Sequence, residues 1–445
     1  MQRTPAAFLL MSLAAMAANT SSVPVTFNKD VLPILQRNCQ SCHRSGEVAP
    51  MSFVTYQETR PWARAIKTAA LTKKMPPWFA DPRYGHFANE RKLTEGEIGT
   101  LVAWAENGAP EGDVKTRPAP VEFLDGWNIG KPDKVIAMPQ AFAVPAEGTV
   151  EYQYIPIPGG FTEDTWVTAA EVRPGNRAVV HHVIAFVRPP GSKWMKDAKP
   201  GVPFAPVVHK RDANGARVDD PQRGGESGGS GGGAFGEFLV GFAPGLQPQR
   251  FDLGGAAKLV PAGSDIVLQM HYTANGKAAT DVTKIGLVLA KEPPQRRYLT
   301  MNAPNGRFAI PPGDPNYEVK SQITLQETAE LVWLMPHMHL RGKDFEFRVV
   351  YPTGESEMLL KVPKFDFNWQ LGYDEVKPLV LPKGTRIECT AHFDNSPNNP
   401  ANPNPKVEVR WGDQSWEEMM IGWFAVVIDA KADPAVLRKS PKSGD

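Results

Sequence analysis

The segment Leu331-Val-Trp-Leu-Met-Pro-His-Met-His-Leu340 ends an apolar run with two histidines, His337 and His339. Alternate residues of a β-strand lie on the same face, so both imidazoles can reach one metal ion. Two unrelated polar residues on a solvated face are the competing interpretation, and the flanking apolar residues disfavour it. The segment therefore predicts a buried strand that supplies two metal ligands.

Strand-like segments recur through the chain after residue 130. They alternate apolar and polar residues between Pro and Gly turns, a pattern typical of antiparallel sandwiches. The predicted strands are Val150–Ile157, Trp166–Val172, Val179–Val187, Asp265–Tyr272, Val282–Leu289, Ala329–Leu334, Phe345–Tyr351 and Arg386–Phe393. We expect two all-β, jelly-roll-like sandwich domains at 131–295 and 296–434, with Glu292–Arg297 at their boundary, and a tail at 435–445.

The chain before residue 114 has helical rather than strand periodicity. Trp62–Leu71 predicts one helix, and a second begins after Thr94, where Glu97 completes a capping box. That helix stops at Asn107-Gly108, and the Pro-rich residues 114–130 predict a linker. We therefore expect a helical domain joined to β domains.

The composition excludes several partners. The 445 residues include 49 Lys and Arg against 48 Asp and Glu, so charge gives no reason to expect binding to nucleic acid or to an anionic membrane. The apolar run Ala6–Ala18 is too short to span a bilayer and predicts a signal peptide at 1–22. An uncleaved N-terminal anchor is the alternative. We expect a periplasmic or secreted protein with no membrane span in its mature chain.

The motif Cys39-Gln40-Ser41-Cys42-His43 is an attachment pattern for one covalent haem c. Its two thiols add to the haem vinyl groups, and the histidine supplies one axial ligand of the iron. A redox dithiol or half of a zinc site is the competing interpretation. Residues 25–113 resemble the small monohaem cytochrome c domains, and this resemblance implies an all-α cytochrome c domain at 24–113.

The second axial ligand is expected to be Met75, which follows His43 by 32 residues. Pro76 and Pro77 restrict the loop behind it, so the thioether can face the iron with little loss of entropy. Met51 and His86 are the alternatives. Ligation by His and Met gives a relatively high potential, which suits the relay of single electrons.

Three further histidines are weaker candidates when each is taken alone. His181 and His182 are adjacent, so a regular strand would point them to opposite faces unless the backbone bends there. His271 is a single histidine on a predicted strand. Met419 could add a thioether that favours Cu(I), although its apolar surroundings also fit a packed core strand.

The chain from about residue 130 to 430 resembles the copper type II, ascorbate-dependent monooxygenases, the family of peptidylglycine α-hydroxylating monooxygenase and dopamine β-hydroxylase. The order and rough spacing of the matching segments agree across this region. These segments are Val180-His181-His182-Val183, Phe242-Ala243-Pro244-Gly245, Leu268-Gln269-Met270-His271-Tyr272, His337-Met338-His339-Leu340-Arg341-Gly342-Lys343 and Trp416-Glu417-Glu418-Met419.

This resemblance implies two mononuclear copper sites on two packed sandwiches. The electron-accepting copper would be held by His181, His182 and His271. The copper at which substrate is hydroxylated would be held by His337, His339 and Met419. In the family the two sites face each other across an open, water-filled cleft.

Several positions depart from the family. Cys389 matches a family cysteine whose usual disulfide partner is replaced here by Met420. Met335, Ile421 and Trp423 occupy positions where the peptide-amidating branch has Arg, Asn and Tyr, so peptide amidation is not expected. His392 has no family counterpart, and we interpret it as a hydrogen-bonded strand histidine.

These observations lead to the hypothesis of an exported copper monooxygenase. It would hydroxylate a C–H bond of a small organic substrate with O₂, and an external donor would supply electrons through the c-type haem. A tethered donor site has a high effective concentration, which gives the fusion a purpose. One alternative is a periplasmic haem and copper protein that transfers electrons or binds copper without hydroxylase activity. Another is a haem–copper reductase of a small nitrogen oxide.

Overall fold

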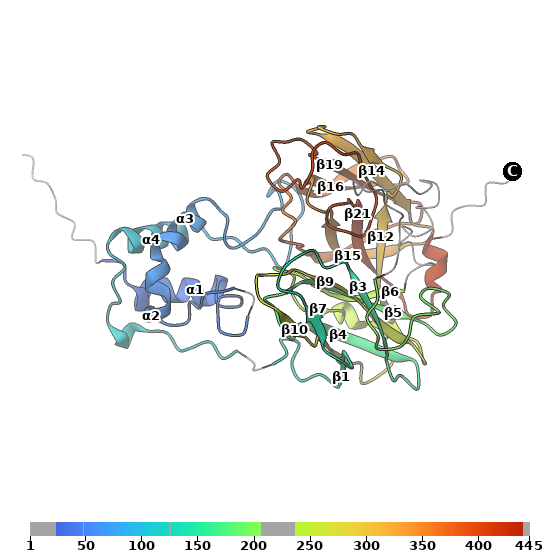
Figure 1. Ribbon diagram of the computed structural model, residues 1–445, viewed down its shortest axis with the longest axis horizontal. Helices are drawn as coiled ribbons and strands as arrows, with labels where there is room; N and C mark the ends of the chain where they lie inside the picture. Colours follow the sequence, from blue (N-terminus) through green and yellow to red (C-terminus); the bar gives the residue numbers. More distant parts are fainter. Residues whose placement is uncertain (1–23, 48, 124–125, 206–235, 439–445) are drawn as a thin grey trace, which may run out of the picture.

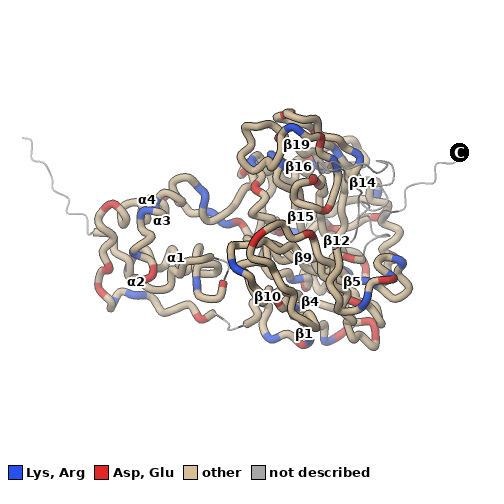
Figure 2. The backbone as a smooth tube through the Cα atoms, in the orientation of Figure 1, with Lys and Arg blue, Asp and Glu red and all other residues tan. Residues whose placement is uncertain are grey.

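The computed structural model describes residues 24–47, 49–123, 126–205 and 236–438. The predicted signal peptide at 1–22 and most of the predicted tail at 435–445 lie outside the described residues. Within the described ranges, no helix is both long enough and apolar enough to cross a membrane. Acidic and basic residues are interspersed over the chain, as Figure 2 shows.

A nine-stranded sheet runs through both halves of the β region (Figure 1). All of its pairs are antiparallel except β8 with β12, which is parallel. The two halves therefore share one sheet, with the β8–β12 pair as the seam. In sheet order the strands are β1 (Lys134–Ala137), β11 (Lys284–Leu289), β4 (Thr165–Arg173), β8 (Ala256–Val260), β12 (Arg296–Pro304), β21 (Ile421–Asp429), β15 (Ala329–His337) and β18 (Tyr373–Leu381), with β7 (Gln249–Arg250) against β4.

Two four-stranded sheets accompany the large sheet, one in each half. The first has the order β3 (Gln153–Pro158), β9 (Asp265–Tyr272), β5 (Val180–Arg188) and β6 (Glu237–Phe242). The second has the order β14 (Tyr317–Thr324), β19 (Arg386–Phe393), β16 (Gly342–Val350) and β17 (Ser356–Val362). Two short ribbons complete the sheets, β2 (Phe142–Val144) with β10 (Ala279–Asp281) and β13 (Ala309–Ile310) with β20 (Val409–Arg410). One continuous apolar core fills both halves.

The predicted β-sandwiches fit this structure. Strands β9 and β19 have the bounds that the sequence pattern predicts. β19 alternates buried and half-buried residues along its length, as expected of a strand with one face on the core. β15 is buried at nearly every position, because it lies between two other strands and is covered by the core.

The predicted all-α cytochrome c domain at 24–113 is wrong. The four α-helices of this region are α1 (Leu32–Asn38), α2 (Tyr56–Thr59), α3 (Ala63–Leu71) and α4 (Glu95–Glu106), and the longest has 12 residues. Short turns η1 (Phe27–Val31), η2 (Arg60–Trp62) and η3 (Val114–Thr116) add to them. The capping box of Thr94 and Glu97 does form, so the local helix signals were correct. Long irregular segments between the helices were not anticipated.

The segment between α3 and α4 explains why no closed helical domain forms. It contains Pro76, Pro77 and Pro82, which cannot continue a helix. It instead crosses to the second sandwich, where the Asp81 amide donates to the Lys361 carbonyl over 2.8 Å and the Ala88 amide donates to the Asp374 carbonyl over 2.8 Å. The helices keep only a small core of their own, and Trp104 is fully buried in it.

A buried lysine lies at the seam of the large sheet. Lys258 on β8 donates to the carbonyls of Phe238 and Leu239 on β6 and to the Thr300 hydroxyl on β12. Its ammonium group also lies over the ring of Phe251, 4.8 Å from the centroid. Burial lowers the pKa of Lys258 to about 7. The side chain thus connects strands of both halves, and its burial there disfavours its charged form.

Protonation of Lys258 should make stability depend on pH. Its pKa is about 7 in the fold and 10.5 in the unfolded chain, so between these values the unfolded state binds more protons and stability rises with pH. Lys258→Met should remove this rise. The measurement is the midpoint of thermal unfolding between about pH 7 and 10. Lys284→Met, on the exposed end of β11, is the control and should keep the wild-type slope; an unchanged slope in Lys258→Met contradicts the assignment.

Candidate functional site

Strands β5 and β9 bring His181, His182 and His271 together. One ligand atom from each lies within 4.8 Å of the others. The register of β5 against β9 shifts between Val180 and His182, and His182 then pairs with His271. Two adjacent residues of a regular strand point to opposite faces, so His181 and His182 can share one site only where the strand is irregular. The register shift is such an irregularity, because a bulge changes the direction of a side chain.

The three imidazoles are prepared to bind a cation. Burial lowers the pKa of His181 and of His182, and it lowers the pKa of His271 to about 3. The rings are therefore neutral, the form that ligates metals. The Nδ1 atoms of His181 and His271 are buried without a hydrogen-bond partner among the described residues. Such unpaired nitrogen atoms fit a bound metal ion, since leaving them unpaired is costly.

The second pair of histidines stands at the end of β15. The rings of His337 and His339 lie 5.3 Å apart at 89°. The Nδ1 atom of His337 contacts Gln370 Oε1 at 3.0 Å, and that of His339 contacts the Glu417 carbonyl at 3.2 Å. Each ring therefore has its Nε2 atom left to face a metal, and Met419 lines the same pocket. A neutral imidazole held through its other nitrogen is the usual form of a metal ligand.

A buried carboxylate shapes the turn that follows β15. Glu418 accepts hydrogen bonds from the amides of His339, over 2.8 Å, and Arg341, over 2.6 Å. Arg341 is itself buried and bonds Asn395 Oδ1 and the Trp416 carbonyl. Because Glu418 immediately precedes Met419, these contacts hold the thioether beside the two histidines. The pattern H-x-H-x-R and the Glu-Met pair are thus physically connected.

The space between the two histidine sites is narrow. A pocket of about 50 Å³ is lined by His182 from the first site and by His337, His339 and Met419 from the second. The expected open, water-filled cleft is therefore not the arrangement in this structure. A polar contact also joins the two sides, because Ser415 Oγ of the second half lies 3.4 Å from His271 Nε2 of the first. Within the first half, Tyr152 Oη lies 2.9 Å from His182 Nε2.

The predicted haem residues line one larger cavity. Cys39, Cys42, His43 and Met75 are all part of the wall of a cavity of about 840 Å³. Met51, one alternative ligand, lies in the same wall, so both thioethers stay candidates. His86 is not part of this wall, and its carbonyl accepts the Val376 amide instead. The cavity is large enough for a cofactor.

The cysteine motif itself folds into one tight turn. The amides of Cys42 and His43 both donate to the Cys39 carbonyl, so the chain turns once and presents both thiols to the cavity. The His43 ring stacks on Phe53 at 4.3 Å, and its buried Nδ1 atom has no partner in the described part of the chain. Burial raises the pKa of Cys39 to about 12, which disfavours a reactive dithiol. These features fit a haem better than the competing interpretation.

The haem cavity and the first histidine site share a wall. His181 belongs to the triad and also lines the cavity. Pro244, Gly245, Asn368 and Trp369 from the sandwiches complete that side. A single imidazole therefore faces both candidate cofactors.

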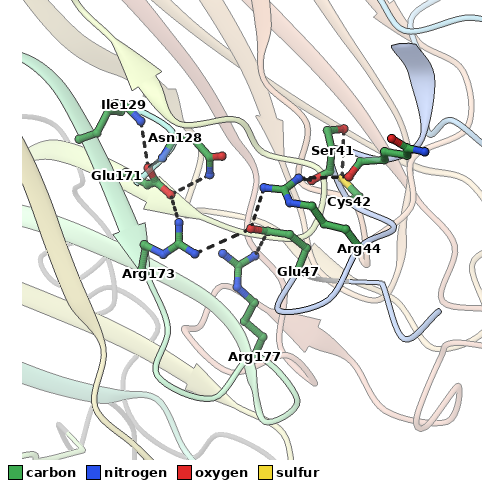
Figure 3. Close-up of polar contacts among 10 residues, drawn as sticks. Ser41, Cys42, Arg44, Glu47, Asn128, Ile129, Glu171, Arg173 and Arg177 are labelled. Atoms are coloured by element: carbon green, nitrogen blue, oxygen red, sulfur yellow. Dashed lines mark hydrogen bonds and ion pairs between the residues drawn. The ribbon is translucent and has the colours of Figure 1, made fainter. Parts of the chain in front are cut away.

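An ionic cluster holds the cysteine motif against the first sandwich (Figure 3). Glu47 follows the motif and lies between three guanidinium groups, those of Arg44 at 3.1 Å, Arg173 at 3.8 Å and Arg177 at 2.8 Å. Only 10% of the Glu47 side chain is exposed. Such a shielded, hydrogen-bonded charge cluster is stronger than a surface ion pair, so it fixes the motif relative to the histidine triad.

Some residues of these sites carry no recognisable sequence signal. Phe367, Asn368, Trp369 and Gln370 lie in an irregular segment, and Glu47 is one charged residue among many. His392, by contrast, is as expected: its Nδ1 atom pairs with Asp344 Oδ1 at 2.7 Å, so it is a hydrogen-bonded strand histidine.

Comparisons with known proteins add little. No protein-family model and no curated protein sequence matches the chain. The infectious bursal disease virus VP2 subviral particle is similar at 9% identity over 69% of this chain and 75% of that chain, with a TM-score of 0.18. PNGF-II is similar at 12% identity over 77% of this chain and 72% of that chain, with a TM-score of 0.27. Likeness at this level carries no argument about function.

Removal of the charge on Glu47 should loosen the cysteine motif. Glu47→Gln removes the carboxylate that lies 2.8 Å from Arg177, although Arg173 keeps Glu171 at 3.2 Å, and we expect a loss of about 2 kcal/mol in the free energy of unfolding. Chemical denaturation measures it. Glu106→Gln is the matched control, because its partner Lys67 is at 2.8 Å but the Glu106 side chain is 57% exposed; its effect should stay within about 0.5 kcal/mol. Equal losses in the two variants would show that the cluster is an ordinary surface contact.

Proposed function

We propose that this chain is an exported, haem- and copper-containing monooxygenase. One covalent haem would attach to Cys39 and Cys42, with His43 and Met75 as axial ligands. Two copper ions would lie in the two histidine sites. The observation that supports the proposal best is that neighbouring sites share residues. His181 belongs to the triad and lines the cavity of the cysteine motif, and His182 belongs to the triad and lines the pocket of the second histidine site.

The proposed reaction consumes two electrons. A C–H bond of a small organic substrate, O₂, two electrons and two protons would give C–OH and water. An external donor would supply the electrons one at a time through the haem. Copper, when bound, would supply one-electron redox chemistry and the activation of O₂. The resemblance to the copper type II monooxygenases supports this reaction class.

The residues around His337 and His339 prepare the second proposed copper site. Burial lowers the pKa of His337 to about 4 and that of His339 well below its usual value, so both rings are neutral. Gln370 and the Glu417 carbonyl orient them through Nδ1. Met419 adds a soft thioether, which favours Cu(I), the state that reduces O₂.

The narrow pocket favours a second candidate function. About 50 Å³ between the sites admits a diatomic molecule or water, not an organic substrate, unless side chains such as Trp411 or Trp423 move aside. A haem and copper protein that only transfers electrons needs no such movement. This second function predicts copper and haem binding without oxygen insertion.

Cofactor content tests both functions at the level of the sites. We expect one covalent haem and two copper ions per chain, measured by intact mass, pyridine haemochrome absorbance and elemental analysis. His271→Ala and His339→Ala should each lose one copper ion and keep the haem. His392→Ala is the control and should keep all three cofactors, because its ring pairs with Asp344. Retention of both copper ions in His271→Ala and in His339→Ala would contradict the assigned ligands.

The role of Met419 separates the two functions. With a reduced donor and ¹⁸O₂, the wild type should place labelled oxygen in an organic product, and Met419→Ile should lose most of this activity. Met420→Ile is the matched control, since it changes the neighbouring buried methionine by a volume-conserving swap that is usually tolerated. No labelled product from any candidate substrate supports the electron-transfer function, and equal activity of Met419→Ile and wild type removes the proposed role of the thioether.

A further inference from the structure

One short segment contacts the haem cavity and both histidine sites. It comprises residues Phe367–Gln370, between β17 and β18, and is called the bridging segment below. Asn368 and Trp369 line the haem cavity, Phe367 packs on the triad, and Gln370 bonds His337 of the second site. The copper-ligand sequence pattern does not include any of these four residues.

The cavity end of the bridging segment lies against His181. Asn368 and His181 both line this side of the cavity. The Trp369 ring packs over Gly245, where an added Cβ would lie 2.9 Å from Trp369 Cε3. Gly245 has φ +85°, a left-handed conformation that suits glycine. The ring can therefore close the wall between cavity and triad.

The middle of the bridging segment lies between the two histidine sites. The Phe367 ring stacks on His181, with centroids 5.0 Å apart and an angle of 15°. The same ring lies 6.4 Å from the His271 ring and 6.0 Å from the His339 ring. One aromatic side chain thus contacts ligands of both proposed copper ions.

Hydrogen bonds fix the conformation of the bridging segment. The Asn368 amide and side chain both donate to Asp366 Oδ1, at 3.0 Å each. Gln370 Nε2 donates to the Phe367 carbonyl at 3.0 Å while its Oε1 contacts His337. Fixed packing matters, because electron tunnelling falls steeply with every gap between packed atoms.

We propose that the bridging segment is the electron path of this protein, with Trp369 and His181 serving the step from haem to triad and Phe367 the step between the copper sites. The inference rests on the proposed function, because it requires haem and copper. In the first step one electron given up by the bound haem would be taken up by a copper ion held by the triad, so the haem would be oxidised and the copper reduced by one electron. In the second step that electron would pass to a copper ion held by His337, His339 and Met419. No covalent bond forms or breaks in either step.

The test follows single electrons in the holoprotein without oxygen. A photo-excited ruthenium complex reduces the haem, and the decay of the ferrous absorbance reports the first step. Freeze-quench EPR of the two Cu(II) signals reports the second step. Copper-depleted protein is the reference and should keep its haem reduced.

Trp369→Leu should slow the decay of ferrous haem about tenfold, which corresponds to 1.4 kcal/mol in the activation barrier. Trp369→Phe keeps an aromatic ring and should stay near the wild-type rate. Trp62→Leu is the matched control, because Trp62 lines the same cavity but belongs to the helical region; its rate should be unchanged. Equal rates in Trp369→Leu and wild type overturn the first step of the path, as does an equal slowing by Trp62→Leu.

Phe367→Leu should leave the decay of ferrous haem near the wild-type rate and slow reduction of the second copper about tenfold. An unchanged EPR time course would overturn the second step. Haem and copper content are measured first in every variant. If the wild type binds no haem or no copper, the proposed function is wrong. If both are bound and these substitutions leave the electron-transfer rates unchanged, only the proposed electron path is wrong.

Discussion

The feature on which both metal proposals depend is the burial of imidazole nitrogens that lack protein partners. His43, His181, His271 and His339 each keep one ring nitrogen buried and unpaired within the described residues. An unsatisfied buried polar group costs about 1–3 kcal/mol of stability. Four such nitrogens therefore lower the free energy of unfolding substantially in a chain that is only marginally stable. The metal ions that we propose would remove this cost, because each of these nitrogens would give its lone pair to a metal ion. The sandwiches keep the nitrogens of His181, His271 and His339 in place, and the turn of the cysteine motif does so for His43.

The continuous sheet explains how two separate sites become neighbours. The parallel pairing of β8 with β12 joins the two sandwiches edge to edge, and the buried Lys258 spans the same seam. The triad on β5 and β9 and the pair at the end of β15 then face one narrow pocket. Two independent domains on a mobile hinge would not give this contact. The narrow pocket is thus a consequence of the shared sheet.

Much of the β region could be predicted from the sequence, because its short apolar-rich segments lie between Pro and Gly turns. The bounds of β9 and β19 follow from that pattern alone. The ligand histidines could also be proposed, since spacing and residue type carry their chemistry. The convergence of His181 and His182 was expected from the family resemblance and not from the strand pattern, because it depends on a register shift that only the pairing with β9 defines. The bridging segment has no periodicity, so nothing in the sequence marks it.

The error over the N-terminal region has a physical cause. The capping box at Thr94 and the apolar spacing of Trp62–Leu71 predict single helices, and those helices are present. They do not predict what the helices pack against. A self-contained helical domain would have to enclose its haem with its own residues, whereas this cavity borrows His181, Asn368 and Trp369 from the sandwiches. The wall of this cavity of about 840 Å³ thus comes from both regions. The haem that we propose there would contact the helices and the sandwiches at once, so its attachment would be coupled to the position of His181.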